Sequence, residues 1–239
     1  MKKAFLLFIF TALGLSTGCN GTLQNTIQNS GITSKQKINF TDFSQITINS
    51  GFELFLTQNG TESISITADQ NVLPHIEYFQ RGNKITFRMQ NGYQAVRKSV
   101  QIFISAKNIS ELSGSGGSSL NAESVLEGDK IKLFLSGESN FTGTIKSTKT
   151  SISQSGSSTS KISGNTMNLD AELSGASKII GPDYIVENLD LDLSGSSNAD
   201  LTVTGKISIN ASGSSHLKYS GEGCITKSSL SGSSSIKVN

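Results

Sequence analysis

Seven Ser-Gly pairs between residue 113 and the end of the sequence recur at a near-constant interval, and their spacing constrains the fold more than any other feature. Successive pairs lie 23, 19, 19, 20, 18 and 19 residues apart, with glycines at Gly114, Gly137, Gly156, Gly175, Gly195, Gly213 and Gly232. Apolar and polar residues alternate on both sides of each pair, and a period of two is the period of a β-strand. Self-similarity at a near-constant interval is typical of a solenoid, in which each repeat forms one coil.

The repeat around Gly195 shows how one coil is built. Leu189, Leu191 and Leu193 alternate with polar residues before the corner, and the alternation resumes after it. A hairpin meander could use strands of this length, but a constant period favours a coil, because each turn then places the same residue type at the same corner. Glycine suits a corner that needs a positive φ, and serine hydroxyls bind the free backbone groups of the turn. We therefore predict an all-β, single-chain parallel β-helix (solenoid) with about 19–20 residues per coil and two or three short strands in each.

The front part, residues 40–106, has a different composition. It holds seven of the nine Phe residues found outside the first 18 positions, and its strand-like runs cover residues 46–49, 52–57, 63–68, 84–89 and 100–105. We predict that this aromatic-rich part forms wider opening coils that cap the Ser/Gly stack, since a solenoid needs an end that hides its apolar interior. No linker separates the parts, so residues 40–239 are predicted to form one domain, divided into 40–106 and 107–239.

The first residues resemble a targeting signal. Lys2 and Lys3 precede an apolar stretch from Ala4 to Leu15, and small residues stand immediately before Cys19. A stretch this short indicates a secretory signal over residues 1–18 and is too short for a transmembrane helix. The small residues before a cysteine resemble a bacterial lipobox, although Ser16 stands where Leu is usual, so we predict lipidation at Cys19. The alternative is an ordinary secretory signal cleaved nearby. Polar residues 19–39 are predicted to be a flexible tether.

Composition excludes several classes of function. The signal carries two of the 20 basic residues and none of the 18 acidic ones, which leaves the mature chain neutral. Without clustered Lys and Arg, nucleic-acid binding is not expected. Two Cys and two His residues leave little for a metal-binding cysteine framework or a Ser-His triad. We expect no cofactor and no enzymatic activity.

Three features together resemble the putative auto-transporter adhesin, head GIN domain family. They are the segment from Ile46 to Thr57, the segment from Ile64 to Ile76, and the serial Ser-Gly-x-Ser motif that follows. The resemblance implies a small secreted or lipid-anchored bacterial protein with a parallel β-helix fold and an adhesion-type role. Many repeats of the family carry an acidic corner that is absent here: the position after the second Ser holds Leu120, Asn140, Thr159, Lys178, Asn198, His216 and Ser235.

Four carboxylates form the most suggestive cluster in the repeat part. Asp170 and Glu172 flank inward positions, and Asp190 and Asp192 repeat the pattern one coil later. The two pairs are therefore expected to stack, and a hard cation such as Ca²⁺ could relieve their repulsion. The alternative is a solvated outer face with counter-ions. The four residues are thus a candidate metal site and no more.

A second candidate site is the stretch from Gln90 to Lys98, which we interpret as a projecting loop. Loops on rigid scaffolds often carry binding residues, so Tyr93, Arg97 and Lys98 are candidate ligand contacts. Tyr78, Phe79 and Arg81 could join Tyr93 in an aromatic-basic patch; the alternative assigns these aromatic side chains to the core.

These features predict a non-enzymatic lipoprotein of the bacterial cell envelope, located at the outer membrane or cell surface. It is expected to act as an adhesin or as a binding or structural module. Its partners are expected to be the membrane, through the lipid anchor, and a glycan or envelope protein, and its coil edges favour self-association. A flat face of Ser, Asn and Thr suits weak multivalent contacts. The alternative is a carbohydrate-active enzyme, a polysaccharide lyase or hydrolase, on a β-helix scaffold.

Overall fold

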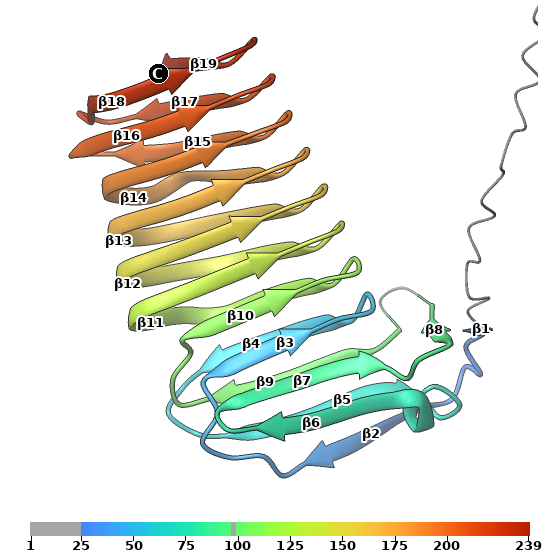
Figure 1. Cartoon of the computed structure of the whole chain (residues 1–239). Helices are drawn as coiled ribbons and strands as arrows, with labels where there is room; N and C mark the ends of the chain where they lie inside the picture. The colour runs from blue at the N-terminus through green and yellow to red at the C-terminus, as the bar shows by residue number, and fades with distance from the viewer. Residues whose placement is uncertain (1–24, 97–98) are drawn as a thin grey trace, which may run out of the picture.

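The chain folds into a parallel β-solenoid of about seven turns, as predicted (Figure 1). The computed structural model describes residues 25–96 and 99–239; the predicted signal and Cys19 lie outside them. The repeat part contains β10 (Glu111–Gly114), β11 (Ser119–Leu135), β12 (Asn140–Gln154), β13 (Thr159–Leu173), β14 (Lys178–Leu193), β15 (Asn198–Val203), β16 (Lys206–Ala211), β17 (His216–Ser220), β18 (Cys224–Leu230) and β19 (Ser235–Val238). No helix within the described ranges has the length and apolar character needed to span a membrane.

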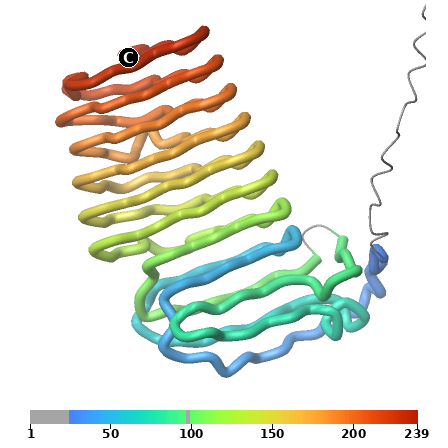
Figure 2. The backbone as a smooth tube through the Cα atoms, viewed as in Figure 1, coloured from blue at the N-terminus to red at the C-terminus, as the bar shows by residue number. Residues whose placement is uncertain are grey.

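Each coil is a flattened loop with two long sides, as the tube in Figure 2 shows. We call the strand segments that lead into the Ser-Gly corners layer A, and the segments that leave them layer B. Layer A comprises β10, the C-terminal parts of β11 to β14, β16 and β18; layer B comprises the N-terminal parts of β11 to β14, β15, β17 and β19. Within each layer, neighbouring coils pair as parallel strands one repeat apart: Leu169 lies opposite Leu189, and Leu189 opposite Ile207.

Alternation along each strand separates the core from the surface. Leu189, Leu191 and Leu193 are buried between the layers, whereas Asp190 and Asp192 between them are exposed. Because successive side chains of a strand point to opposite faces, the polar residues of every coil are directed outward. The parallel register then places them in rows that run along the stack.

The Ser-Gly corner brings neighbouring backbones into close contact. Gly195 has a φ of +75°, and a Cβ at this position would lie 2.7 Å from the carbonyl oxygen of Gly175. That same oxygen accepts a hydrogen bond of 2.7 Å from the backbone N–H of Ser196. The second serine of the motif, Ser197, is completely buried and donates to the Ser194 carbonyl at 2.9 Å. Both residues of the motif therefore have the roles that the sequence predicts.

The first corner of the repeat part is not at Gly114, as the spacing predicted. Gly114 ends strand β10, and the left-handed corner residue is Gly116, with a φ of +66°. The residue after the second Ser of this motif is therefore Ser119, which lies opposite Asn140. Leu120 does not belong to the row of residues that follow the second Ser. A second Ser-Gly pair, Ser113-Gly114, stands two residues before the true corner and disguised the register. A further corner, at Ser50 and Gly51 in the front part, lies directly beneath Gly116.

We predict that Gly195→Val lowers the melting temperature far more than Ser197→Ala. A side chain at Gly195 meets two costs: about 1–2 kcal/mol for a left-handed backbone and about 1–3 kcal/mol for forced packing. Loss of the Ser197 hydroxyl costs about 1 kcal/mol. With roughly 2–4 °C per kcal/mol for a domain of this size, thermal denaturation followed by circular dichroism should separate the two variants. Equal shifts would contradict the role of the corner.

A pair of alanine substitutions separates backbone strain from stacking. Gly60 has a φ of +82° but no atom within 4 Å of the place that a Cβ would occupy, whereas Gly195 faces a backbone oxygen. Gly60→Ala should therefore destabilise by strain alone, about 1–2 kcal/mol, and Gly195→Ala by clearly more. If both variants melt at the same temperature, close approach between coils contributes nothing.

The front part contains β1 (Asn25–Ile27), β2 (Thr33–Ile38), β3 (Gln45–Ile48), β4 (Glu53–Gln58), β5 (Ser63–Asp69), the 3₁₀ turn η1 (Leu73–His75), β6 (Ile76–Arg81), β7 (Lys84–Met89), β8 (Tyr93–Ala95) and β9 (Gln101–Ala106). All five predicted strands are present within about a residue of their predicted bounds. Strands β3 and β4 continue layers A and B below β10 and β11, and β7 and β9 pair parallel with them.

The expectation that the whole front part consists of wider coils is wrong beyond β7 and β9. Strand β6 pairs antiparallel with β7, and β5 and β2 extend layer B by antiparallel pairing with β9 and with each other. These strands close the lower end of the stack in Figure 1. The coil geometry therefore ends at β7 and β9.

The predicted tether over residues 19–39 is also wrong in its C-terminal part. Strand β2 is the edge strand of layer B, and its last residue, Ile38, is buried against the core. Upstream, β1 pairs with β8. Alternating Lys, Gln and Ser residues in β2 conceal the strand, because an edge strand exposes one face and one backbone edge to water.

A buried polar cluster interrupts the apolar core of the repeat part. Tyr184 is fully buried, and its hydroxyl lies 2.7 Å from the hydroxyl of Thr150, which in turn lies 2.7 Å from that of Ser147. Ser147 also lies 3.1 Å from the Thr166 hydroxyl. Burial raises the pKa of Tyr184 to about 12, because the phenolate would lose its hydration.

This pKa predicts a loss of stability at high pH. Tyrosine ionises near pH 10 in the unfolded chain but near 12 in the fold, so unfolding releases a proton between these values and stability falls as pH rises. At about 1.4 kcal/mol per pKa unit, Tyr184 contributes a loss of about 2 kcal/mol by pH 12. Tyr184→Phe should lower stability at pH 7 by about 1 kcal/mol and flatten the pH dependence above pH 10. Urea denaturation of both proteins from pH 7 to 11.5 tests this; parallel curves would contradict it.

Candidate binding groove

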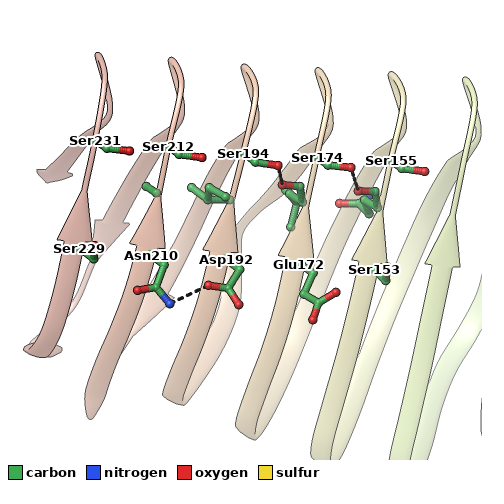
Figure 3. A pocket seen from close by; sticks show the side chains of 14 residues that line it. Ser153, Ser155, Glu172, Ser174, Asp192, Ser194, Asn210, Ser212, Ser229 and Ser231 are labelled. Atoms are coloured by element: carbon green, nitrogen blue, oxygen red, sulfur yellow. Dashed lines mark hydrogen bonds between the residues drawn. The ribbon is translucent and has the colours of Figure 1, made fainter.

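An open groove of about 460 Å³ runs along the outer face of layer A, beside the Ser-Gly corners (Figure 3). Two rows of polar side chains line it, each with one residue per coil. The inner row is Ser153, Glu172, Asp192, Asn210 and Ser229; the corner row is Ser155, Ser174, Ser194, Ser212 and Ser231. We call this feature the corner groove.

Strand register builds the inner row. Ser153 lies opposite Glu172, Glu172 opposite Asp192, and each further member opposite the next. Adjacent members are therefore separated by the spacing of hydrogen-bonded strands, about 4.8 Å. Because hydrogen bonds between coils set this spacing, the row is a rigid array whose geometry does not depend on side-chain packing.

The polar side chains that line the groove make few strong hydrogen bonds with other described residues. Asn210 Nδ2 donates to Asp192 Oδ1 at 2.8 Å, and the hydroxyls of Ser174 and Ser194 donate weakly to carbonyl oxygens of the preceding coil, at 3.5 and 3.4 Å. Glu172 and Asp192 are both exposed, and neither forms an ion pair with a described residue. The groove therefore offers two carboxylate acceptors beside rows of neutral donors and acceptors.

The four acidic residues singled out in the sequence lie as predicted: Asp170 lies opposite Asp190, and Glu172 opposite Asp192. Only the second pair lines the corner groove. Asp170 instead approaches Lys149, with an N–O distance of 3.5 Å. Within the ranges that the structure describes, no three His, Cys, Asp or Glu side chains converge closely enough to hold a metal ion.

The second candidate site is not simply a projecting loop. Residues Tyr93–Ala95 form strand β8, which pairs with β1, and the Tyr93 ring stacks on His75 at 4.1 Å between centroids. Arg97 and Lys98 lie outside the described residues.

Of the predicted aromatic-basic patch, only Phe79 and Arg81 come together. Arg81 lies 5.2 Å from the Phe79 ring centroid, and Arg88, which the sequence did not single out, lies 5.7 Å from it. Tyr78 is partly buried against Phe87 and accepts a hydrogen bond from Gln36. Tyr78 therefore supports the core interpretation.

Sequence reasoning identified the acidic members of the corner groove but missed the rest. Ser153, Asn210 and Ser229 occupy the position two residues before the Ser-Gly pair, one coil from their neighbours in the row. Aligning the repeats by their corners and reading each outward position down the stack would have revealed the row.

Comparison with known proteins identifies the fold and the family. A family model described as "Putative auto-transporter adhesin, head GIN domain" matches residues 42–223. No match was found among curated proteins.

Three bacterial proteins are among the solved structures that share the fold. A putative lipid binding protein from Parabacteroides distasonis has a TM-score of 0.75 and 18% identity, covering 90% of this chain and 100% of that one. A putative adhesin from Bacteroides fragilis has a TM-score of 0.78 and 18% identity over 89% and 98% of the two chains. A putative adhesin from Parabacteroides merdae has a TM-score of 0.71 and 21% identity over 90% and 99%.

Repulsion between the stacked carboxylates of Glu172 and Asp192 should lower the free energy of unfolding. Like charges directly opposite on paired strands destabilise by roughly 0.2–1 kcal/mol, so Glu172→Gln should raise the melting temperature at low ionic strength. Salt screens this repulsion over a length of about 3 Å at 1 M, against about 30 Å at 0.01 M. The gain should therefore shrink as salt is added, and thermal denaturation at these two salt concentrations measures it.

Glu127→Gln is the matched control, because Glu127 lies 3.9 Å from Lys146 instead of beside an acid. Neutralising Glu127 should leave stability unchanged or lower it slightly. A Glu172→Gln protein that gains nothing over this control would show that the two carboxylates do not interact.

Proposed function

The chain belongs to the putative auto-transporter adhesin, head GIN domain family, and from this membership we propose that it is a non-enzymatic binding module that holds its ligand in the corner groove. The observation that carries the proposal is the array itself. Five successive coils each present a hydrogen-bonding side chain of the inner row and a serine of the corner row, held at strand spacing on a rigid stack.

A chain-like, hydroxylated ligand fits this array. A glycan that lies along the stack would meet the same kinds of group in coil after coil, and many weak contacts on one ligand add up to useful affinity. Glu172 and Asp192 would accept hydrogen bonds from sugar hydroxyl or amino groups, and such bonds to a charged acceptor are stronger than neutral ones. The same carboxylates would repel anionic chains. Neutral or amino-bearing glycans are therefore the proposed class.

The proposed setting is the outside of the bacterial envelope, with an anchor at Cys19. The lipobox-like pattern and the family support this location. The front part, where β1 lies, is at one end of the solenoid, and the coils of the corner groove extend toward the other end (Figure 1). An anchor that precedes β1 would hold the groove away from the membrane, where it can meet a ligand on another surface.

Glycoside hydrolysis is not favoured by this geometry. That reaction needs one carboxyl group kept protonated near neutral pH, usually by burial, beside a second that is ionised. Glu172 and Asp192 are adjacent but both exposed, and Asp192 is committed to Asn210. Binding without turnover is the simpler use of the site.

A glycan array probed with residues 20–239 tests the proposal. We expect binding to neutral or amino glycans in buffer with either calcium or chelator, because the residues that line the groove offer acceptors that do not converge as metal ligands. A Glu172→Lys/Asp192→Lys variant should lose at least about tenfold in affinity, equivalent to about 1.4 kcal/mol.

Asp183→Lys/Glu187→Lys is the matched control, since both residues are exposed on β14 and neither lines the groove. Unchanged binding by Glu172→Lys/Asp192→Lys would exclude the corner groove as the site. Absence of any glycan binding would overturn the proposed ligand class, and release of reducing ends from a bound glycan would overturn the non-enzymatic assignment.

A further inference from the structure

The two ends of the described stack differ in how well they cover the apolar interior. At the front end, the inward residues of the outermost strands are buried: Ile38 of β2 and Ile76 of β6 are each 7% exposed. Strands β18 and β19 form the last coil at the other end (Figure 1), and two of its residues, Leu230 and Val238, are 46% and 56% exposed. We call the uncovered side of this coil the open end.

Strand register shows that the exposed side chains of the open end belong to the core. Leu230 lies opposite Ala211, and Val238 opposite Tyr219, and both partners are buried between the layers. Ile225, which is 39% exposed, continues an inward row in the same way. These residues are therefore directed inward, and they are exposed because no described coil lies over them.

The backbone of the last coil is open on the same side. Within residues 25–96 and 99–239, β18 pairs only with β16 and β19 only with β17, so one edge of each strand carries free N–H and C=O groups. Solenoids usually cover such an end with a polar capping repeat. A free strand edge beside exposed apolar side chains is instead a template for pairing with another chain.

We propose that the open end binds the open end of a second copy of this chain, in a closed dimer with twofold symmetry. A twofold axis perpendicular to the stack reverses the direction of every strand, so the free edges of the two copies meet as antiparallel pairs. The molecule already uses antiparallel pairing at its front end, where β5 joins β9. Because the front end exposes no comparable apolar interior, the assembly stops at two copies.

The size of the open end suits a dimer of modest affinity. The seven residues of β18 extend over about 23 Å, and two layers about 10 Å apart with their outward side chains give a width of about 20 Å. Two such faces would bury roughly 900 Å², close to the lower limit of roughly 1,000 Å² for a specific interface. Each copy also brings Lys227 and Lys237 and no acid on these two strands, and the like charges repel weakly. We therefore expect a dissociation constant in the micromolar range.

This inference goes beyond the proposed glycan binding and does not depend on it. The corner groove reaches the last coil, where Ser229 and Ser231 line it, so the dimer would bring the ends of two grooves to one interface. Two linked sites raise the avidity for a repetitive ligand. Association itself requires no glycan, so either proposal can fail without the other.

Sedimentation-equilibrium ultracentrifugation of residues 20–239, with no glycan present, tests the proposal. A reducing agent prevents the exposed thiol of Cys224 from linking copies covalently. We expect a reversible equilibrium between monomer and dimer at micromolar concentrations. A protein that stays monomeric up to submillimolar concentrations would overturn the proposal, and so would growth into species larger than a dimer.

A pair of variants locates the interface. Leu230→Lys/Val238→Lys places charges inside the proposed contact and should weaken dimerisation at least tenfold. Phe134→Lys/Met167→Lys is the matched control, because these side chains are 38% and 52% exposed but lie on β11 and β13, away from the last coil. Melting temperatures confirm that each variant is folded. Equal dimerisation by the two variants would overturn the assignment to the open end.

A charge-reversed variant provides a second test that leaves the core side chains unchanged. Lys227→Glu/Lys237→Glu should pair with the unmodified chain more tightly than either protein pairs with itself, because opposite charges then meet across the interface. Energy transfer between differently labelled copies measures this preference at low salt. A mixture that shows no preference for the mixed dimer would contradict an interface formed by β18 and β19.

Discussion

Close contact between glycine backbones at the Ser-Gly corner is the constraint on which the rest of the structure depends. Gly156, Gly175, Gly195, Gly213 and Gly232 each have a positive φ, and each would place a Cβ within 2.7 Å of the carbonyl oxygen of the glycine in the preceding coil. The same oxygens accept hydrogen bonds of 2.7 Å from the residue that follows the glycine of the next coil. Each corner therefore fixes the position of the next coil relative to the last. Because the corners set the register, the inward leucines and the outward polar residues occupy equivalent positions in successive coils.

The parallel register also forces like charges to lie next to each other on the outer surface of the stack. A parallel stack repeats the position of a side chain in every coil, so two acids at equivalent positions, such as Glu172 and Asp192, must lie side by side. A globular fold would separate them by a small shift of one element, but the corner contact forbids a shift of one coil alone. Uncompensated acceptors on a rigid array favour a ligand that brings donors.

The sequence predicts the repeat part well and the front part incompletely, for physical reasons. Period and corner residues are local signals, so the parallel stack, the inward leucines and the stacked acids could all be predicted. Gly114 was mistaken for a corner because Ser-Gly occurs there twice; the positive φ of Gly116 identifies the true corner. Strand β2 was missed because its pairing with β5 is non-local and its composition is that of an exposed edge. The corner groove depends on which outward positions share a row, and an error of two residues in the register of one coil would misplace that coil's member of the row.

The two layers give the molecule two surfaces of different character from one repeat. Outward positions of layer A beside the corners carry serines and acids, whereas the matching positions of layer B near the C-terminal end carry lysines. Because a thin apolar core separates the layers, substitutions on one face need not disturb the other, and each row can change its chemistry without altering the corner. A neutral net charge for the mature chain therefore does not indicate a featureless surface, because acids line the corner groove on layer A whereas Lys178, Lys218 and Lys237 lie on the outer face of layer B. A solenoid of this kind can offer separate sites to unlike parts of a single heteropolymer, provided that the corner glycines remain unchanged.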